Sequence, residues 1–149
     1  MQRAALALLS VFVLQACDSE SKTKSTSAAA TPTVAPSAAK AAVLAAYTIK
    51  GIEFAYFRIP AGLSREQLIS AAQALHEQEP KAQLVLVDDD TKLKEYVTYV
   101  KAISGQGELN EPMPQEWADK HIVANVQLYM SGKFMLCESN GSKEIAELK

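Results

Sequence analysis

The sequence predicts an α/β (α+β) domain in which two main helices pack on a mixed sheet, as a two-layer sandwich with a C-terminal β-hairpin. The first observation is a run of aromatic and β-branched residues at positions 47–59, which predicts a strand. A second apolar run at 84–87 follows a segment with helical spacing, so a right-handed crossover would make the two strands parallel. The third observation is the alternation of apolar and polar residues over 122–130, which leads into Ser131-Gly132 and predicts the hairpin.

The first part of the domain is expected to be one strand followed by a capped helix. The alternation in 47–59 changes phase at Gly51, which indicates a bulge or bend there. Beyond this point both faces are apolar, as in a strand that is covered on two sides. Ser64 and Gln67 fit a capping box, so we expect a helix that begins after Ser64 and ends near Gln78.

The second part of the domain is expected to contain a further helix, a short helix and the hairpin. Apolar residues recur at helical spacing over 93–103, which predicts the second main helix. Pro114 suits the first turn of a short helix that carries Trp117. The tail at 143–149 fits a strand and a helix equally well.

The hairpin also predicts the position of Cys137. A two-residue loop would pair Leu128 with Met135 and Val126 with Cys137, and these four side chains would share one face. If that face is the core, Leu128 is buried and Cys137 is a buried, unreactive thiol. The alternative is a redox-active or intermolecular cysteine.

The amino terminus has the pattern of a signal peptide. Positions 4–14 form an unbroken run of eleven mostly apolar residues. A membrane-spanning helix needs about 20 such residues, whereas the core of a signal peptide needs about 7–15. The run leads into Leu14-Gln15-Ala16-Cys17, which resembles the lipobox of bacterial lipoproteins.

This resemblance implies transfer of diacylglycerol to Cys17, cleavage after Ala16 and acylation of the new amino terminus. It further implies a chain tethered to the bacterial cell envelope. Asp18, directly after the cysteine, resembles the residue found there in lipoproteins that are retained in the inner membrane, which implies the periplasmic face of that membrane, with the outer membrane as the alternative. The expected divisions are a signal peptide (1–16), a lipidated cysteine with a disordered tether rich in Ser, Thr, Ala and Pro (17–42), and one domain (43–149).

Composition argues against some classes of function. The formal net charge is −2 and the pI about 5.7. Proteins that bind nucleic acid are usually basic, because neutralising phosphates drives that binding, so no nucleic-acid partner is expected. The chain has two cysteines. With Cys17 acylated, Cys137 has no intramolecular disulfide partner.

Candidate chemistry is sparse. Asp88, Asp89 and Asp90 follow an expected strand, where ligands often bind in α/β folds, and they are weak candidates for a divalent cation. Their alternative role is to cap the next helix and to favour its positive end.

Four residues remain to be considered for chemistry or contact. His121 and Cys137 are a conceivable nucleophilic pair. Trp117 either packs in the core or marks a possible interaction surface, and packing is favoured. His76 lies late in the first helix, where a positive charge would suit the helix dipole.

No catalytic motif or cofactor signature is present, so we expect no enzyme and no cofactor. The leading hypothesis is a membrane-anchored, non-enzymatic interaction or accessory module of the cell envelope, which would meet an envelope protein partner. The alternative is a periplasmic lipoprotein that binds a small ligand or a metal ion at the aspartates. The domain resembles small α/β lipoproteins of uncharacterised function, and this resemblance carries no activity with it.

Overall fold

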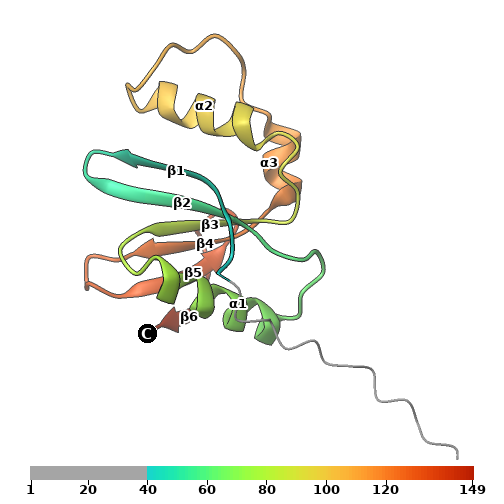
Figure 1. Ribbon diagram of the computed structural model, residues 1–149, viewed down its shortest axis with the longest axis vertical. Helices are drawn as coiled ribbons and strands as arrows, with labels where there is room; N and C mark the ends of the chain where they lie inside the picture. Colours follow the sequence, from blue (N-terminus) through green and yellow to red (C-terminus); the bar gives the residue numbers. More distant parts are fainter. Residues whose placement is uncertain (1–39) are drawn as a thin grey trace, which may run out of the picture. The chain divides into compact units, whose positions relative to one another are not determined.

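The computed structural model describes residues 40–149, which form a six-stranded mixed sheet and three helices (Figure 1). The strands follow one another across the sheet in chain order: β1 (Val43–Ile49), β2 (Ile52–Arg58), β3 (Gln83–Val87), β4 (Ile122–Leu128), β5 (Phe134–Glu138) and β6 (Glu144–Leu148). The β2–β3 pair is parallel and the other four pairs are antiparallel. The predicted α/β class, mixed sheet and C-terminal hairpin are therefore confirmed.

The run of residues 47–59 forms parts of two strands, so the prediction of one bent strand was wrong. Ile49 pairs with Ile52, and only Lys50 and Gly51 lie between them. Both turn residues have positive φ, 51° for Lys50 and 84° for Gly51. Positive φ at both central positions defines the tight turn whose twist matches that of two antiparallel strands. The phase change at Gly51 was the mark of a hairpin turn and not of a bulge.

The first helix, α1 (Arg65–Gln78), begins as the sequence predicts. The Ser64 side chain accepts a hydrogen bond from the Gln67 amide, and the Gln67 side chain accepts one from the Ser64 amide at 2.8 Å. Both halves of the capping box are thus formed. The helix connects β2 to β3, and this crossover makes the two strands parallel, as expected.

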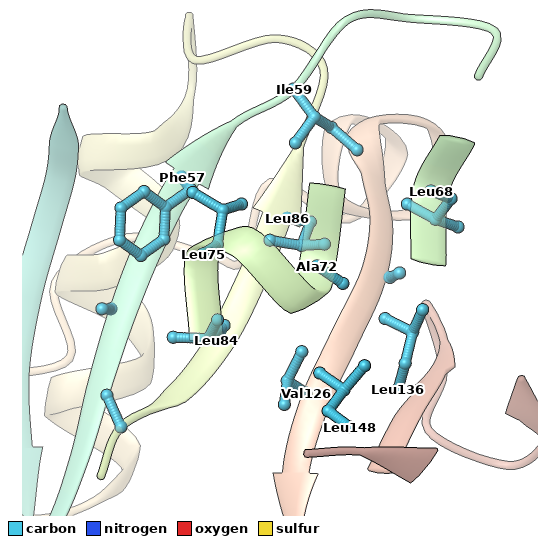
Figure 2. Close-up of a cluster of buried hydrophobic side chains, with 13 residues drawn as sticks. Phe57, Ile59, Leu68, Ala72, Leu75, Leu84, Leu86, Val126, Leu136 and Leu148 are labelled. Atoms are coloured by element: carbon cyan, nitrogen blue, oxygen red, sulfur yellow. The ribbon is translucent and has the colours of Figure 1, made fainter. Parts of the chain in front are cut away.

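The helices lie on both faces of the sheet, which adds a partial third layer to the two that were expected. On one face, α1 packs its buried Leu68, Ala72 and Leu75 against the central strands (Figure 2). On the other face lie α2 (Leu93–Ile103) and α3 (Gln115–His121), which contribute Leu93 and Trp117 to a second cluster.

Two-sided burial is possible because β2 and β3 are apolar at neighbouring positions. Phe57 and Leu86 face α1, whereas Tyr56 and Val87 belong to the cluster under α2 and α3. Consecutive residues of a strand point to opposite faces, so these strands need apolar side chains without alternation. The apolar character of both faces after Gly51 had indicated this.

The β4–β5 hairpin has a register one residue away from the predicted one. Leu128 pairs with Phe134, because the Tyr129 amide bonds to the Lys133 carbonyl at 2.9 Å and encloses a three-residue loop. Gly132 takes φ 80°, as the last residue of such a loop requires. The loop has one residue more than we expected.

The shifted register changes which side chains share a face. Val126 pairs with Leu136, and both are fully buried in the α1-side cluster. Cys137 pairs with Asn125 and points to the opposite face. Leu128, at the end of β4, is 47% exposed, so its predicted burial was wrong.

The C-terminal tail, which the sequence left open, is the edge strand β6. Side chains of α1 bind its backbone: Arg65 donates to the Ile145 carbonyl at 2.7 Å, and Gln73 donates to the Lys149 carbonyl at 2.7 Å. The Gln73 side chain also accepts a hydrogen bond from the Lys149 amide at 3.0 Å. This edge is therefore covered by α1.

No helix within residues 40–149 is long and apolar enough to cross a membrane.

His76 is buried, which does not suit the cation expected at the end of α1. Its ring lies 4.4 Å from the ring of Phe134, measured between centroids. The Nδ1 atom is buried with no hydrogen-bond partner among the described residues. Burial lowers the pKa of His76 below its ordinary 6.5, so the neutral ring is favoured.

The position of the core can be tested with two leucines. Leu86→Ala removes a fully buried side chain from β3 and is expected to lower the free energy of unfolding by about 2–5 kcal/mol. Leu128→Ala changes a half-exposed side chain and is expected to cost less than about 1 kcal/mol. Chemical denaturation followed by circular dichroism measures both. Equal losses for the two variants would contradict the hairpin register.

The burial of His76 predicts a loss of stability in mild acid. The folded state holds the pKa of His76 below that of the unfolded chain, so the unfolded state binds the proton first. The contribution of His76 is complete above pH 6.5 and is lost as the pH falls below that value. In His76→Leu this part of the pH dependence should disappear. Denaturation curves between pH 5 and 8 test this, and parallel profiles for the two proteins would disprove it.

Candidate functional site

The predicted aspartate cluster lies where β3 ends, directly beside the start of β4. Val87 is the last residue of β3 and pairs with Ile122, the first residue of β4. This pairing brings Asp88 next to His121, the last residue of α3. The candidate site therefore joins the carboxyl end of a buried strand to the carboxyl end of a short helix.

Asp88 and His121 are joined through both backbone and side chains. The Asp88 amide donates to the His121 carbonyl at 3.1 Å, and Asp88 Oδ1 lies 2.8 Å from His121 Nδ1. Both side chains are about four-fifths buried, at 20% and 23% exposed. Such a contact fixes the orientation of the imidazole ring.

Asp89 bonds to three donors with the same carboxylate oxygen. The Thr91 amide and the Thr91 hydroxyl each donate to Oδ1 at 2.6 Å, and Trp117 Nε1 donates at 3.2 Å. These hydrogen bonds stabilise the ionised carboxylate and lower the pKa of Asp89 from 3.8 to about 2; the bonds from Thr91 have the largest effect. Asp89 thus links the turn after β3 to the indole of α3.

Asp90 points to a third partner. Its Oδ1 lies 3.2 Å from Arg58 Nη1 at the end of β2, and both side chains are exposed. Ion pairs in this setting contribute about 0–1 kcal/mol to stability. The Asp90 carbonyl also accepts a hydrogen bond from the Leu93 amide at 3.2 Å, where α2 begins.

The three carboxylates therefore diverge and do not form a common ligand set. Among residues 40–149, no group of three His, Cys, Asp or Glu side chains is placed to hold a metal ion. The alternative role of the aspartates was to cap the next helix and to favour its positive end. It is only partly observed, because the N-cap of α2 is Lys92, whose side chain makes no capping hydrogen bond. Asp89 instead closes the turn that precedes the helix.

Trp117 has a packing role. It is 7% exposed and belongs to the cluster under α2 and α3. Its ring continues a row of aromatic contacts, with centroid distances of 5.7 Å to Tyr96 and 6.2 Å to His121. Tyr96 in turn lies 6.3 Å from Tyr56. A side chain this well buried does not present an interaction surface.

Cys137 is buried, as predicted, although it lies on the face opposite to Val126. Its Sγ atom lies 3.6 Å from the Tyr129 hydroxyl and 3.7 Å from the Met135 carbonyl. The partner of His121 is Asp88 and not Cys137. The structure therefore does not form the nucleophilic pair considered from the sequence.

Sequence reasoning missed the Asp88–His121 pair. The two residues are 33 positions apart, and no local pattern links them. Only the pairing of β3 with β4, including a register shift between Leu86 and Val87, places them together. An Asp–His pair is a unit that orients imidazole in catalytic and metal sites. Here its other neighbour is the Trp117 ring, which makes it part of the packing between α3 and the sheet.

Two hollows flank the edge strand β1, and no sequence pattern had indicated them. One, of about 380 Å³, lies between β1 and α2 and is lined by Leu44, Leu93 and Val97 among others. The second, of about 340 Å³, lies on the face that α1 covers and includes Val43 and Ala46. They leave β1 open to contact on both sides.

Cys17 lies outside the described residues, so its lipidation stays a prediction.

The sequence matches no protein-family model, no curated protein and no solved structure. The assignment of function therefore depends on the residues of this chain.

The Asp89 contacts predict a measurable loss on amidation. Asp89→Asn removes the negative charge of the carboxylate that accepts hydrogen bonds from Thr91 and Trp117, so the thermal midpoint of unfolding at pH 7 should fall. Trp117 is the one tryptophan of the chain, so its fluorescence reports the transition. Asp90→Asn, which breaks only the exposed pair with Arg58, is the matched control and should change the midpoint little.

The same contacts set the sign of the pH dependence. The folded pKa of Asp89 is about 2, below the ordinary 3.8, so its stabilising effect is present above pH 3.8. It is lost as the pH falls from 3.8 toward 2. Asp89→Asn should lack this step, and an unchanged acid transition would show that the contacts do not stabilise the fold.

Proposed function

We propose that this chain is a lipid-anchored, non-enzymatic interaction or accessory module of a bacterial cell envelope. The observation that carries the proposal is the run at 4–14 followed by Leu14-Gln15-Ala16-Cys17. Acyl chains on Cys17 would hold the protein on a membrane, because each buried methylene contributes about 0.8 kcal/mol and two or more chains give lasting anchorage.

The start of the fold supports this arrangement. The first strand begins at Val43, well after Cys17 in the sequence. The segment between them is rich in Ser, Thr, Ala and Pro, the composition on which the predicted tether rests. Ala41 then donates to the Gln78 side chain at 3.0 Å, which fixes the chain to the end of α1 where the domain starts.

A tethered domain acts through proximity. Confinement to a membrane raises its effective concentration toward other components of the same membrane, so a modest surface can bind usefully. Asp18 favours the periplasmic face of the inner membrane as the site of action. The partner in this proposal is an envelope protein.

Two cysteine variants test the anchor. Metabolic labelling with palmitate is expected to label the wild-type chain and Cys137→Ala but not Cys17→Ser, because Cys137 is buried in the folded domain. Mass spectrometry of the amino-terminal peptide should show acylation at Cys17 and loss of residues 1–16. Equal labelling of wild type and Cys17→Ser would refute the anchor.

The interaction role is tested by cross-linking in native cells. A defined protein should be recovered with the wild type and with Cys137→Ala, and it should be lost with Cys17→Ser. Recovery that does not depend on Cys17 would contradict an action that needs the membrane.

A further inference from the structure

The two edges of the sheet are treated differently by the rest of the fold. At β6, Arg65 and Gln73 occupy backbone groups of Ile145 and Lys149. Charged side chains also accompany that edge, with Glu147 bound to Lys133 at 2.7 Å. Covering and charging an edge are the means by which proteins prevent further strand pairing.

The other edge, β1, is neither covered nor charged, and its one irregularity is a register shift between Val43 and Ala45 that leaves Ala45–Ile49 regularly paired. Its sequence from Val43 to Ile49 has no charged residue, no proline and no glycine. Among the described residues, the one side-chain hydrogen bond to the backbone of β1 comes from Gln106, which donates to the Thr48 carbonyl at 2.7 Å. An uncharged, open edge of this kind is a template for a further strand.

The register shows which backbone groups are available. Ile49 of β1 and Ile52 of β2 flank the two-residue turn, so the two residues form a hydrogen-bonded pair. Backbone groups of alternate residues then point away from β2, which directs those of Ala46 and Thr48 outward. The alternation is interrupted at Leu44, because the register shifts between Val43 and Ala45. The bond from Gln106 to the Thr48 carbonyl agrees with this direction.

The hollows beside β1 carry opposite charges. The hollow under α2 contains Lys94 and Lys101, together with Asp90, whose charge is offset by Arg58. The hollow on the α1 face contains Glu53 and Glu79; the charge of Glu79 is offset by Lys40 at 3.9 Å, so Glu53 gives this hollow its negative charge.

We infer that β1 is a docking edge for an extended segment of another protein, which adds a strand to the sheet. In this added strand, acidic or apolar side chains that face α2 alternate with basic or apolar side chains that face α1. Alternate residues of an added strand point to opposite faces and so enter the two hollows in turn. This inference rests on the proposed interaction function and names its surface and the chemistry of its partner.

Charge argues against a second copy of this chain as the occupant. Antiparallel pairing of β1 with β1 across a two-fold axis keeps the faces of both copies together. Lys94 and Lys101 would then meet the same lysines of the partner, and the glutamates would meet glutamates. Like charges placed opposite one another are destabilising, so a strand of complementary charge is favoured.

The test uses the full chain with Cys17→Ser and three fluorescein-labelled peptides of Val, Glu and Lys. The mixed peptide has two glutamates on one face of the extended strand and two lysines on the other, whereas the controls have four glutamates or four lysines. Fluorescence anisotropy should show the mixed peptide binding about three- to tenfold more tightly than either control. Equal binding of all three, or no binding, would overturn the inference.

Hydrogen exchange locates the contact without any mutation in the domain. Addition of the mixed peptide should slow exchange of the outward amides of Ala46 and Thr48. Protection elsewhere on the domain, with none at β1, would reject this edge.

Protein variants then separate the hydrogen bonds from the charges. Ala46→Pro removes one outward donor from an exposed position of β1, and proline is tolerated on edge strands, so peptide affinity should fall about tenfold in a folded protein. Lys94→Glu with Lys101→Glu should weaken binding of the mixed peptide and of the four-glutamate peptide, whereas Lys120→Glu on α3 should change neither. Light scattering that shows a dimer lost on Ala46→Pro would identify a second copy as the occupant and refute the inference.

Failure here is distinguishable from failure of the proposed function. Acylation of Cys17 and a Cys17-dependent partner do not depend on the peptides. If those hold while no peptide binds, the module stands and β1 is not its docking edge.

Discussion

The burial of β3 on both faces is the constraint on which the rest of this structure depends. Leu84 and Leu86 are fully buried under α1, while Val85 and Val87 are buried on the opposite face. A strand that contributes to two apolar clusters must lie inside the sheet, with neighbours on both sides and helices above and below. The crossover through α1 supplies one neighbour and one cover, and the return of the chain through α2, α3 and β4 supplies the others.

The same constraint creates the polar junction at the end of β3. Once Val87 pairs with Ile122, Asp88 and Asp89 must lie against the short helix that precedes β4. Their bonds to His121 and Trp117 satisfy polar groups that would otherwise be buried alone. What first suggested a cation site is thus used to fasten α3 to the sheet, which leaves the outer surface of the domain as the part free to bind.

Sequence predicted local features well and long-range placement less well. The capping box of Ser64 and Gln67 and the alternation of β4 depend on neighbours within a few positions, so a single chain displays them directly. The hairpin register failed because one extra loop residue, accommodated by Gly132, shifts every pair that follows. The Lys50-Gly51 turn was hidden because a non-glycine residue with positive φ is uncommon. The Asp88–His121 pair needs the β3–β4 register, which periodicity does not contain.

The covered edge at β6 has a consequence for many copies of the domain at high local concentration. Head-to-tail joining of an open edge to the far edge of the next copy would generate an unlimited ribbon, because such contacts do not close. Arg65 and Gln73 already hold the backbone of Ile145 and Lys149, so the far edge offers no continuation. If β1 receives a strand as inferred, the domain is monovalent: the growth of its sheet stops after that strand.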